Sequence, residues 1–219
     1  MASSSLTVII LVSFSFVVGT PLKEKQQTAL NHIDVNWEAP KDIKNRFIYY
    51  KSGYDYDDLP VIVLEFGNWD FQGAAENGGK DFETASLYLD QVLARILRGF
   101  FHEKSNMSDS IPVDKEIVAI VDFDGLNLSQ LKSPPTLKWM LDRLSKMGII
   151  YNAISYGFIV NANPLVYQMI NTVKPFISNF LEKVDIYGTN VNHWKTHILK
   201  KIPSSELHPR YGGNQHFRP

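Results

Sequence analysis

The C-terminal third of the chain contains a strand, a long helix and a second strand in direct succession, and this order constrains the fold most. Residues 156–160 and 184–187 are strand-like, and Leu165 to Leu181 repeats apolar residues every three or four positions, as one helix face requires. These apolar residues are Leu165, Val166, Met169, Ile170, Val173, Phe176, Ile177, Phe180 and Leu181. Units of this kind build α/β domains.

The same alternation extends upstream. Further strands are predicted at residues 61–66 and 117–123, and further helices at 82–101, 136–147 and 192–200. Residues 117–123 are apolar almost throughout, as is typical of a central strand covered on both faces. Residues 68–80 contain three glycines and are expected to form a loop. We therefore expect an α/β domain with a mostly parallel sheet.

Pro175 interrupts the long apolar-faced helix. A proline inside a helix removes one backbone hydrogen bond and kinks or breaks the helix, so this segment is expected to be articulated. No cluster of catalytic residues accompanies its wide apolar surface. The combination indicates a hinged lid over an apolar cavity, in a protein that holds a hydrophobic molecule without transforming it.

The composition excludes several classes of function. The chain of 219 residues has 22 basic and 23 acidic side chains and no cysteine. This balanced charge gives no overall attraction to nucleic acid. The lack of cysteine excludes disulfides, thiolate nucleophiles and zinc–thiolate sites.

The N-terminus carries an apolar run from Leu6 to Val18, which is 13 residues long. A bilayer span needs about 20 apolar residues, so this run fits the core of a secretory signal peptide cut after Gly19. We therefore expect a signal peptide at residues 1–19, followed by a short N-terminal segment or linker at 20–45.

Two sequons agree with a secreted glycoprotein. Asn106 is followed by Met-Ser in a polar segment, and Asn127 is followed by Leu-Ser after a predicted strand. The expected location is extracellular, and a cytoplasmic protein peripheral to membranes is the alternative.

Asp122 and Asp124 follow an apolar strand in the order Asp-Phe-Asp-Gly, which resembles the first motif of haloacid-dehalogenase-type phosphatases. In such enzymes the first Asp is a nucleophile and the second a general acid, beside magnesium. Here Leu126 stands where those enzymes have Thr, and the downstream acidic residues are scattered. A magnesium-dependent phosphatase is therefore the weaker alternative, and capping of the strand end is the ordinary role of these side chains.

His193 and His197 lie one helical turn apart, a spacing that can hold a metal ion. The Glu that follows the first His in zinc proteases is Trp194 here, and the sequence offers no obvious third ligand. We therefore expect surface histidines, and we predict no metal, no cofactor and no catalytic site.

Five motifs, in this order and spacing, resemble the CRAL-TRIO lipid-binding domain, particularly its invertebrate members. They occupy residues 117–125, 161–164, 173–176, 183–188 and 207–213. They read Ile-Val-Ala-Ile-Val-Asp-Phe-Asp-Gly, Asn-Ala-Asn-Pro, Val-Lys-Pro-Phe, Lys-Val-Asp-Ile-Tyr-Gly and Leu-His-Pro-Arg-Tyr-Gly-Gly. The resemblance places the domain at residues 46–217.

The resemblance implies a sheet floor, helical walls and a mobile helical gate, at about residues 165–182, over a hydrophobic cavity. Such a domain binds a phospholipid, a tocopherol-like or a retinoid-like molecule and transfers it between membranes, with transient membrane contact and no catalysis. The residues expected to line the cavity and gate are Phe158, Val160, Tyr167, Ile170, Val173, Phe176, Ile177, Phe180 and Lys183.

Two departures from the family pattern concern the ligand. Phosphoinositide-binding members have a Glu in a Tyr-Pro-Glu-Arg segment, where residues 150–154 read Ile-Tyr-Asn-Ala-Ile. Lys183 matches the family's lysine, but Phe180 stands where the family has Thr. The resemblance therefore favours a ligand less polar than phosphatidylinositol. A scaffold of the same fold, with its cavity filled by its own side chains, is the other alternative.

Overall fold

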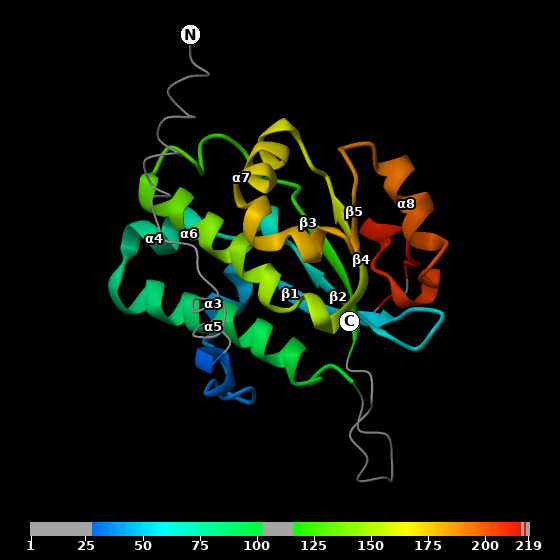
Figure 1. Ribbon diagram of the computed structural model, residues 1–219, viewed down its shortest axis with the longest axis horizontal. Coiled ribbons are helices and arrows are strands. Elements are labelled where there is room, and N and C mark those ends of the chain that lie inside the picture. Colours follow the sequence, from blue (N-terminus) through cyan, green and yellow to red (C-terminus); the bar gives the residue numbers. More distant parts are fainter. Residues whose placement is uncertain (1–27, 103–115, 216, 218–219) are drawn as a thin grey trace.

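The computed structural model describes residues 28–102, 116–215 and 217 and places a five-stranded sheet at the centre of the molecule (Figure 1). The strands lie in sequence order: β1 (Tyr49–Tyr54), β2 (Pro60–Leu64), β3 (Ile117–Asp122), β4 (Ile154–Val160) and β5 (Val184–Ile186). β1 is antiparallel to β2, whereas β2 to β5 are parallel neighbours. The predicted α/β fold with a mostly parallel sheet is confirmed.

Helices cover both faces of the sheet, as is usual for parallel strands. One face lies beneath α3 (Lys41–Arg46), α4 (Phe71–Asn77), α5 (Gly79–Leu97), α6 (Pro134–Lys146) and α7 (Pro164–Leu181). The other lies beneath α8 (Val191–Leu199) and the C-terminal segment, at the right of Figure 1. The short 3₁₀ helices are η1 (Phe66–Asn68), η2 (Met147–Ile149), η3 (Tyr151–Ala153), η4 (Ser204–Glu206) and η5 (Pro209–Tyr211).

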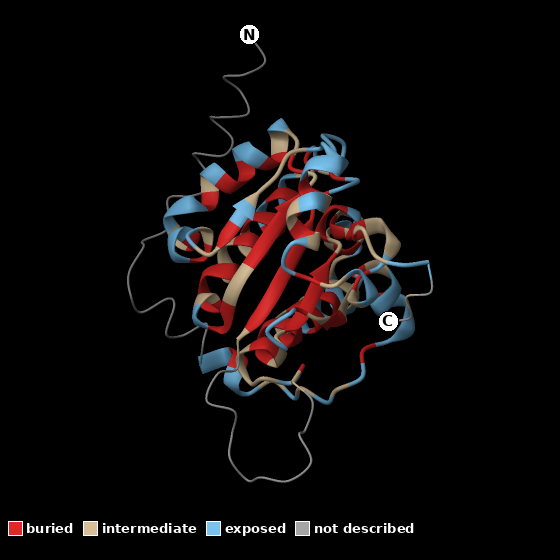
Figure 2. Ribbon diagram, turned by 90° about the vertical axis from the view of Figure 1, so that its right-hand side faces the viewer, coloured by how far each residue is buried: buried red, intermediate tan, exposed pale blue. Residues whose placement is uncertain are grey.

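Alternate residues of the inner strands point to opposite faces of the sheet and enter two separate hydrophobic cores. Ile62 and Ile159 belong to the larger core, beneath α3 to α7. Val63 and Val160 belong to the smaller core, beneath α8. Figure 2 shows the buried strands between the two layers, and every residue of β2 and β3 is buried.

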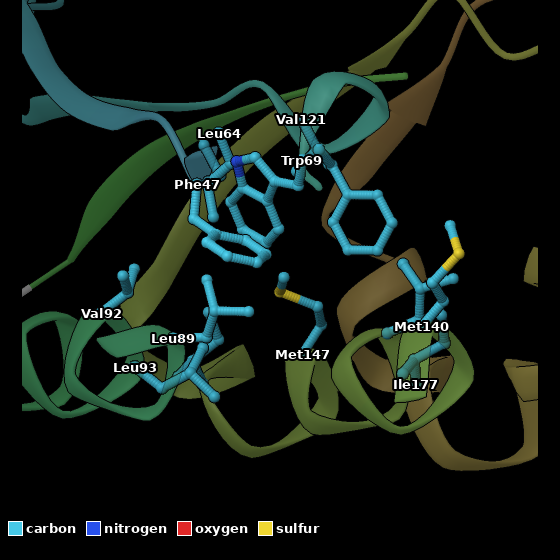
Figure 3. Packing of buried hydrophobic residues seen from close by; sticks show 14 of the residues in the cluster. Phe47, Leu64, Trp69, Leu89, Val92, Leu93, Val121, Met140, Met147 and Ile177 are labelled. Carbon is cyan, nitrogen blue, oxygen red and sulfur yellow. The ribbon is translucent and has the colours of Figure 1, made fainter. Parts of the chain in front are cut away.

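Aromatic side chains form a continuous cluster within the larger core. Neighbouring ring centroids lie 4.8 to 6.2 Å apart. The members of this aromatic cluster are Phe47, Phe66, Trp69, Phe71, Phe82, Phe123 and Trp139. Figure 3 shows Phe47 next to Trp69, in the same core as Met147 and Ile177. Each such ring pair adds about 0.5–1.5 kcal/mol beyond its buried area.

The segment at residues 68–80 is not a loop throughout, as its glycines predict, because it contains α4 and the start of α5. The Asp70 side chain caps α4 by accepting a hydrogen bond from the backbone N–H of Gly73 at 2.9 Å. Phe71 and Ala74 are fully buried. Capping and tertiary packing therefore outweigh the low helix propensity of glycine.

Two predictions fall outside the described residues, namely the signal peptide at residues 1–19 and the sequon at Asn106. Among the residues that the structure describes, no helix is long and apolar enough to cross a membrane.

Candidate functional site

The α7 helix corresponds to the predicted gate and begins at a polar cap. The Asn163 side chain accepts hydrogen bonds from the backbone N–H groups of Leu165 (3.0 Å) and Val166 (3.1 Å). Its amide also donates to the carbonyl oxygen of Leu126 at 3.0 Å. Pro164 follows at the start of the helix, where its missing N–H is not needed. These contacts fix the point at which α7 starts.

One face of α7 is buried in the larger core. It consists of Val166, Met169, Ile170, Val173, Ile177 and Phe180, none of them more than 4% exposed. Burial of such a side chain contributes about 1.5–3 kcal/mol. The inner face of α7 therefore contributes substantially to the stability of the fold.

The helix is interrupted near its C-terminal end. Ile177, two residues after Pro175, has non-helical torsion angles (φ −120°, ψ 15°), so α7 is interrupted close to the predicted place. At the same place α7 approaches η2 so closely that a Cβ atom on Gly148 would overlap the carbonyl oxygen of Phe176. A glycine is needed at this contact, because any side chain there would push α7 away from η2.

The apolar space found beneath the gate is small. A pocket between α6 and α7 has a volume of about 10 Å³ and is lined by residues such as Leu137, Leu141 and Met169. A single water molecule needs about 10–15 Å³ by the same measure. This pocket has no room for a lipid.

The structure brings most of the predicted gate residues together. Ile170, Val173, Ile177 and Phe180 all belong to the larger core, and Phe176 packs half-buried against it. Tyr167 instead lies on the outer face of α7 and is 40% exposed. In this position of the helix, Tyr167 does not line the interior.

The structure separates Phe158 and Val160 from the gate, which corrects the prediction that they line one cavity with it. Both lie on the opposite face of the sheet, in the smaller core with Trp194 of α8. Successive residues of a strand point to opposite faces. Ile159 is therefore the residue of this stretch that belongs to the core beneath α7.

Lys183 lies at the amino ends of the parallel strands. Its Nζ atom donates to the carbonyl oxygen of Ile154 at 2.5 Å and lies 3.5 Å from the Glu116 carboxylate. Ile154 is the first residue of β4, so Lys183 is at the opposite end of this strand from the capped start of α7.

Asn127, the described sequon residue, is exposed in the loop after β3.

Asp122, for which the sequence suggests strand capping or, as the weaker alternative, a phosphatase nucleophile, organises the carboxyl ends of the strands. It is 1% exposed. Its two oxygens contact the backbone N–H of Asp124, the Asn161 amide, the Tyr211 hydroxyl and the Arg210 guanidinium, at 2.8 to 3.0 Å. Both oxygens are occupied by donors and Asp122 is buried, so no oxygen is free for the nucleophilic attack that the phosphatase alternative requires.

These contacts join segments that are distant in sequence. Arg210 and Tyr211 belong to the C-terminal motif, whereas Asn161 precedes the gate. Burial and the Asp122 carboxylate raise the pKa of Tyr211 well above its ordinary range, so its hydroxyl stays protonated and donates. We call Asp122, Asn161, Arg210 and Tyr211 the Asp122 hub. The sequence indicates the hub only through three of the CRAL-TRIO-like motifs, which together contain its four residues. These motifs occupy residues 117–125, 161–164 and 207–213.

A comparison with known families matches residues 44–213 to the CRAL/TRIO domain, which is more than half of the chain. The chain belongs to the CRAL/TRIO family. Among solved structures, this CRAL/TRIO chain is similar to Sfh5 in its crystal structure, with a TM-score of 0.57 and 10% sequence identity. The similarity covers 89% of this chain and 65% of Sfh5. At this identity the likeness shows the fold alone.

Family membership confirms the predicted resemblance and supports binding of a lipid or another small hydrophobic ligand, generally without catalysis.

Within the described part of the chain, no group of three His, Cys, Asp or Glu side chains could hold a metal ion. His193 and His197 instead pack against each other and against Tyr187, with ring centroids 4.9 to 5.4 Å apart. The histidine pair is therefore accounted for by aromatic packing on α8.

Proposed function

We propose that this CRAL/TRIO domain binds a small hydrophobic molecule beneath α7, transfers it between membranes and catalyses no reaction. The observation that carries the proposal is the interrupted α7 helix, whose apolar face covers the larger core. A phospholipid, a tocopherol-like or a retinoid-like molecule fits this chemistry. Phe180, at the position of the family's threonine, favours a ligand less polar than phosphatidylinositol.

Opening the gate costs free energy that an apolar partner has to offset. The inner face of α7 buries six apolar side chains. Exposing all six to water would cost roughly 9–18 kcal/mol, at about 1.5–3 kcal/mol each. An open gate in water alone would therefore be scarcely populated. Contact with a membrane, or with the entering ligand, replaces the lost burial, so we expect opening at a lipid surface.

Lipid extraction from the purified protein, followed by mass spectrometry, tests this proposal. We expect a defined lipid or isoprenoid in the wild type and about tenfold less in Val173→Asp, because a carboxylate beneath the gate disfavours an apolar guest. Asn171→Asp is the matched control, since Asn171 lies on the exposed face of the same helix. Equal loading of Val173→Asp and the wild type, at retained thermal stability, would contradict the gate assignment.

A specific observation favours a second candidate, a CRAL/TRIO scaffold whose interior is filled by its own side chains. The pocket between α6 and α7 measures about 10 Å³, and the aromatic cluster occupies the larger core. Wild-type protein that releases no lipid on extraction, and takes none up from vesicles, would favour this scaffold over the carrier.

We also propose that the protein is secreted after removal of residues 1–19 and is glycosylated at Asn127. The apolar run from Leu6 to Val18 supports the first step, and the exposure of Asn127 supports the second. N-terminal sequencing of protein from the culture medium should begin near Thr20, and deglycosylation should increase its gel mobility. A retained Met1 would contradict the secretory assignment.

A further inference from the structure

A polar pocket of about 490 Å³ lies outside the carboxyl ends of β3 and β4, next to α8. Its walls include Asp124 after β3, Asn161 and Asn163 after β4, Thr189 after β5, Lys195 of α8 and Arg210 of the C-terminal motif. This volume is within the range of small-molecule sites, which is about 300–1,000 Å³. Phe123 and Leu126 of the larger core also line it, whereas no residue of α7 does.

The topology of the sheet creates this pocket. The chain leaves β4 for α7, which covers one face of the sheet, and leaves the neighbouring β5 for α8, which covers the other face. Connections that diverge in this way leave a crevice at the carboxyl edge of the sheet. Open α/β sheets bind their ligands in such crevices.

The charged side chains of the walls leave one cation without a carboxylate partner. Arg210 is more than neutralised, because it faces three carboxylates: Asp122 at 3.0 Å, Asp124 at 2.8 Å and Glu65 at 4.0 Å. Lys195 forms no ion pair with any described residue, and its Nζ atom lies 3.4 Å from the carbonyl oxygen of Pro209. The pocket therefore offers an ammonium group that a bound anion can neutralise.

Further donors surround this cation. The backbone N–H groups of Val191 and Asn192, at the start of the nine-residue α8, have no acceptor among the described residues. Trp194 also lines the pocket and is 1% exposed, but its indole nitrogen is itself buried and does not face the pocket. Free N–H groups at a helix start favour anions, in particular phosphate groups.

We propose that this pocket binds a phosphomonoester, carried either by a soluble molecule or by a lipid headgroup, at a site separate from the core beneath α7. A phosphomonoester has a charge of about −1.5 to −2 at neutral pH and three acceptor oxygens. Lys195 supplies the unpaired positive charge, and Thr189 and the first turn of α8 supply neutral donors. Asn161 belongs both to this pocket and to the Asp122 hub, so the bound anion would lie beside the loop that leads into the gate.

Isothermal titration calorimetry with sn-glycerol 3-phosphate, in a buffer free of phosphate, tests the soluble form. We expect saturable binding by the wild type and about tenfold or greater weakening in Lys195→Gln, which loses a charged hydrogen bond. Lys195→Arg should keep most of the affinity. Lys200→Gln is the matched control, because Lys200 is exposed at the end of the same helix and does not line the pocket.

Flotation with phosphatidylcholine vesicles, with and without phosphatidic acid, tests the lipid form. Binding that requires both phosphatidic acid and Lys195 supports a headgroup as the source of the phosphomonoester. Binding of sn-glycerol 3-phosphate that requires Lys195 supports a soluble source. The proposal is overturned if neither probe binds, or if Lys195→Gln and Lys200→Gln bind both probes as the wild type does, while thermal unfolding shows all variants folded.

Discussion

At the scale of single residues, the Asp122 carboxylate holds three parts of the chain in place. It contacts the turn after β3, the loop before α7 and the C-terminal motif. A buried charge is costly without partners, so each of these contacts matters more than a surface contact would. The loop that starts the gate therefore depends on a segment that follows it by some fifty residues of sequence, as the positions of Asn161 and Tyr211 show.

Asp122→Asn should destabilise the protein. The substitution keeps the shape of the side chain but leaves Arg210 without its buried counter-charge and converts one acceptor into a donor. We expect a loss of about 2–3 kcal/mol in the free energy of unfolding, since Arg210 itself is partly exposed.

Urea unfolding measures this effect, and Asp124→Asn is its control. The Asp124 side chain is 64% exposed, so its substitution should cost less than about 1 kcal/mol. Equal losses in the two variants would show that the hub does not stabilise the fold. Magnesium-dependent phosphatase activity that Asp122→Asn removes would overturn the non-catalytic assignment.

For Asp122, the sequence predicts the position of the residue but not its contacts. An acidic residue after an apolar strand is visible as a pattern, so its place at the strand end could be predicted. Its partners Asn161 and Tyr211 lie 39 and 89 residues away. The order of the strands in the sheet brings these residues together, and no short stretch of the sequence reveals that order. The resemblance to CRAL-TRIO domains identified the segments but not the contacts between them.

At the scale of elements, α7 and η2 form the contact that holds the gate in place. The interrupted turn at Ile177 rests on η2, and Gly148 permits the backbone approach. A helix that is already non-helical at one residue has fewer hydrogen bonds to lose when it bends. The end of α7 nearest η2 is therefore the expected hinge.

Gly148→Ala should loosen this contact, because the added methyl group would overlap the Phe176 carbonyl oxygen. We expect a loss of stability of about 1–3 kcal/mol and faster exchange of a fluorescent lipid with vesicles. Gly188→Ala is the control, since a Cβ atom there would lie at an ordinary 3.8 Å from the nearest carbonyl oxygen. Identical exchange rates in the two variants would argue against a hinge at η2.

The elements themselves were largely predictable from the sequence. The long helices have strong apolar periodicity, and α6, α7 and α8 begin and end within a few residues of their predicted bounds. β1 was missed because it is an edge strand of mixed composition with an irregular register between Lys51 and Gly53. α4 was missed because its glycine suggested a loop, whereas Phe71 and the Asp70 cap stabilise a helix.

At the scale of the whole molecule, the sheet separates two regions with different chemistry. The face beneath α7 is apolar and buried, whereas the carboxyl edge next to α8 has a polar pocket. The sequence predicted the first region, but Phe158 and Val160 were wrongly placed in it. The face of the sheet to which a strand residue points depends on the register of the sheet. A carrier of this kind has to move α7 before a ligand can enter.

The distance between α6 and α7 in the presence of lipid is the most direct test of this motion. The chain has no cysteine, so spin labels attach only at Lys138→Cys and Tyr167→Cys, two exposed positions on α6 and α7. Pulsed electron paramagnetic resonance should give one short distance in lipid-free buffer and an additional longer distance with phosphatidylcholine vesicles. An unchanged distance distribution, in a sample that has demonstrably taken up lipid, would contradict the gate.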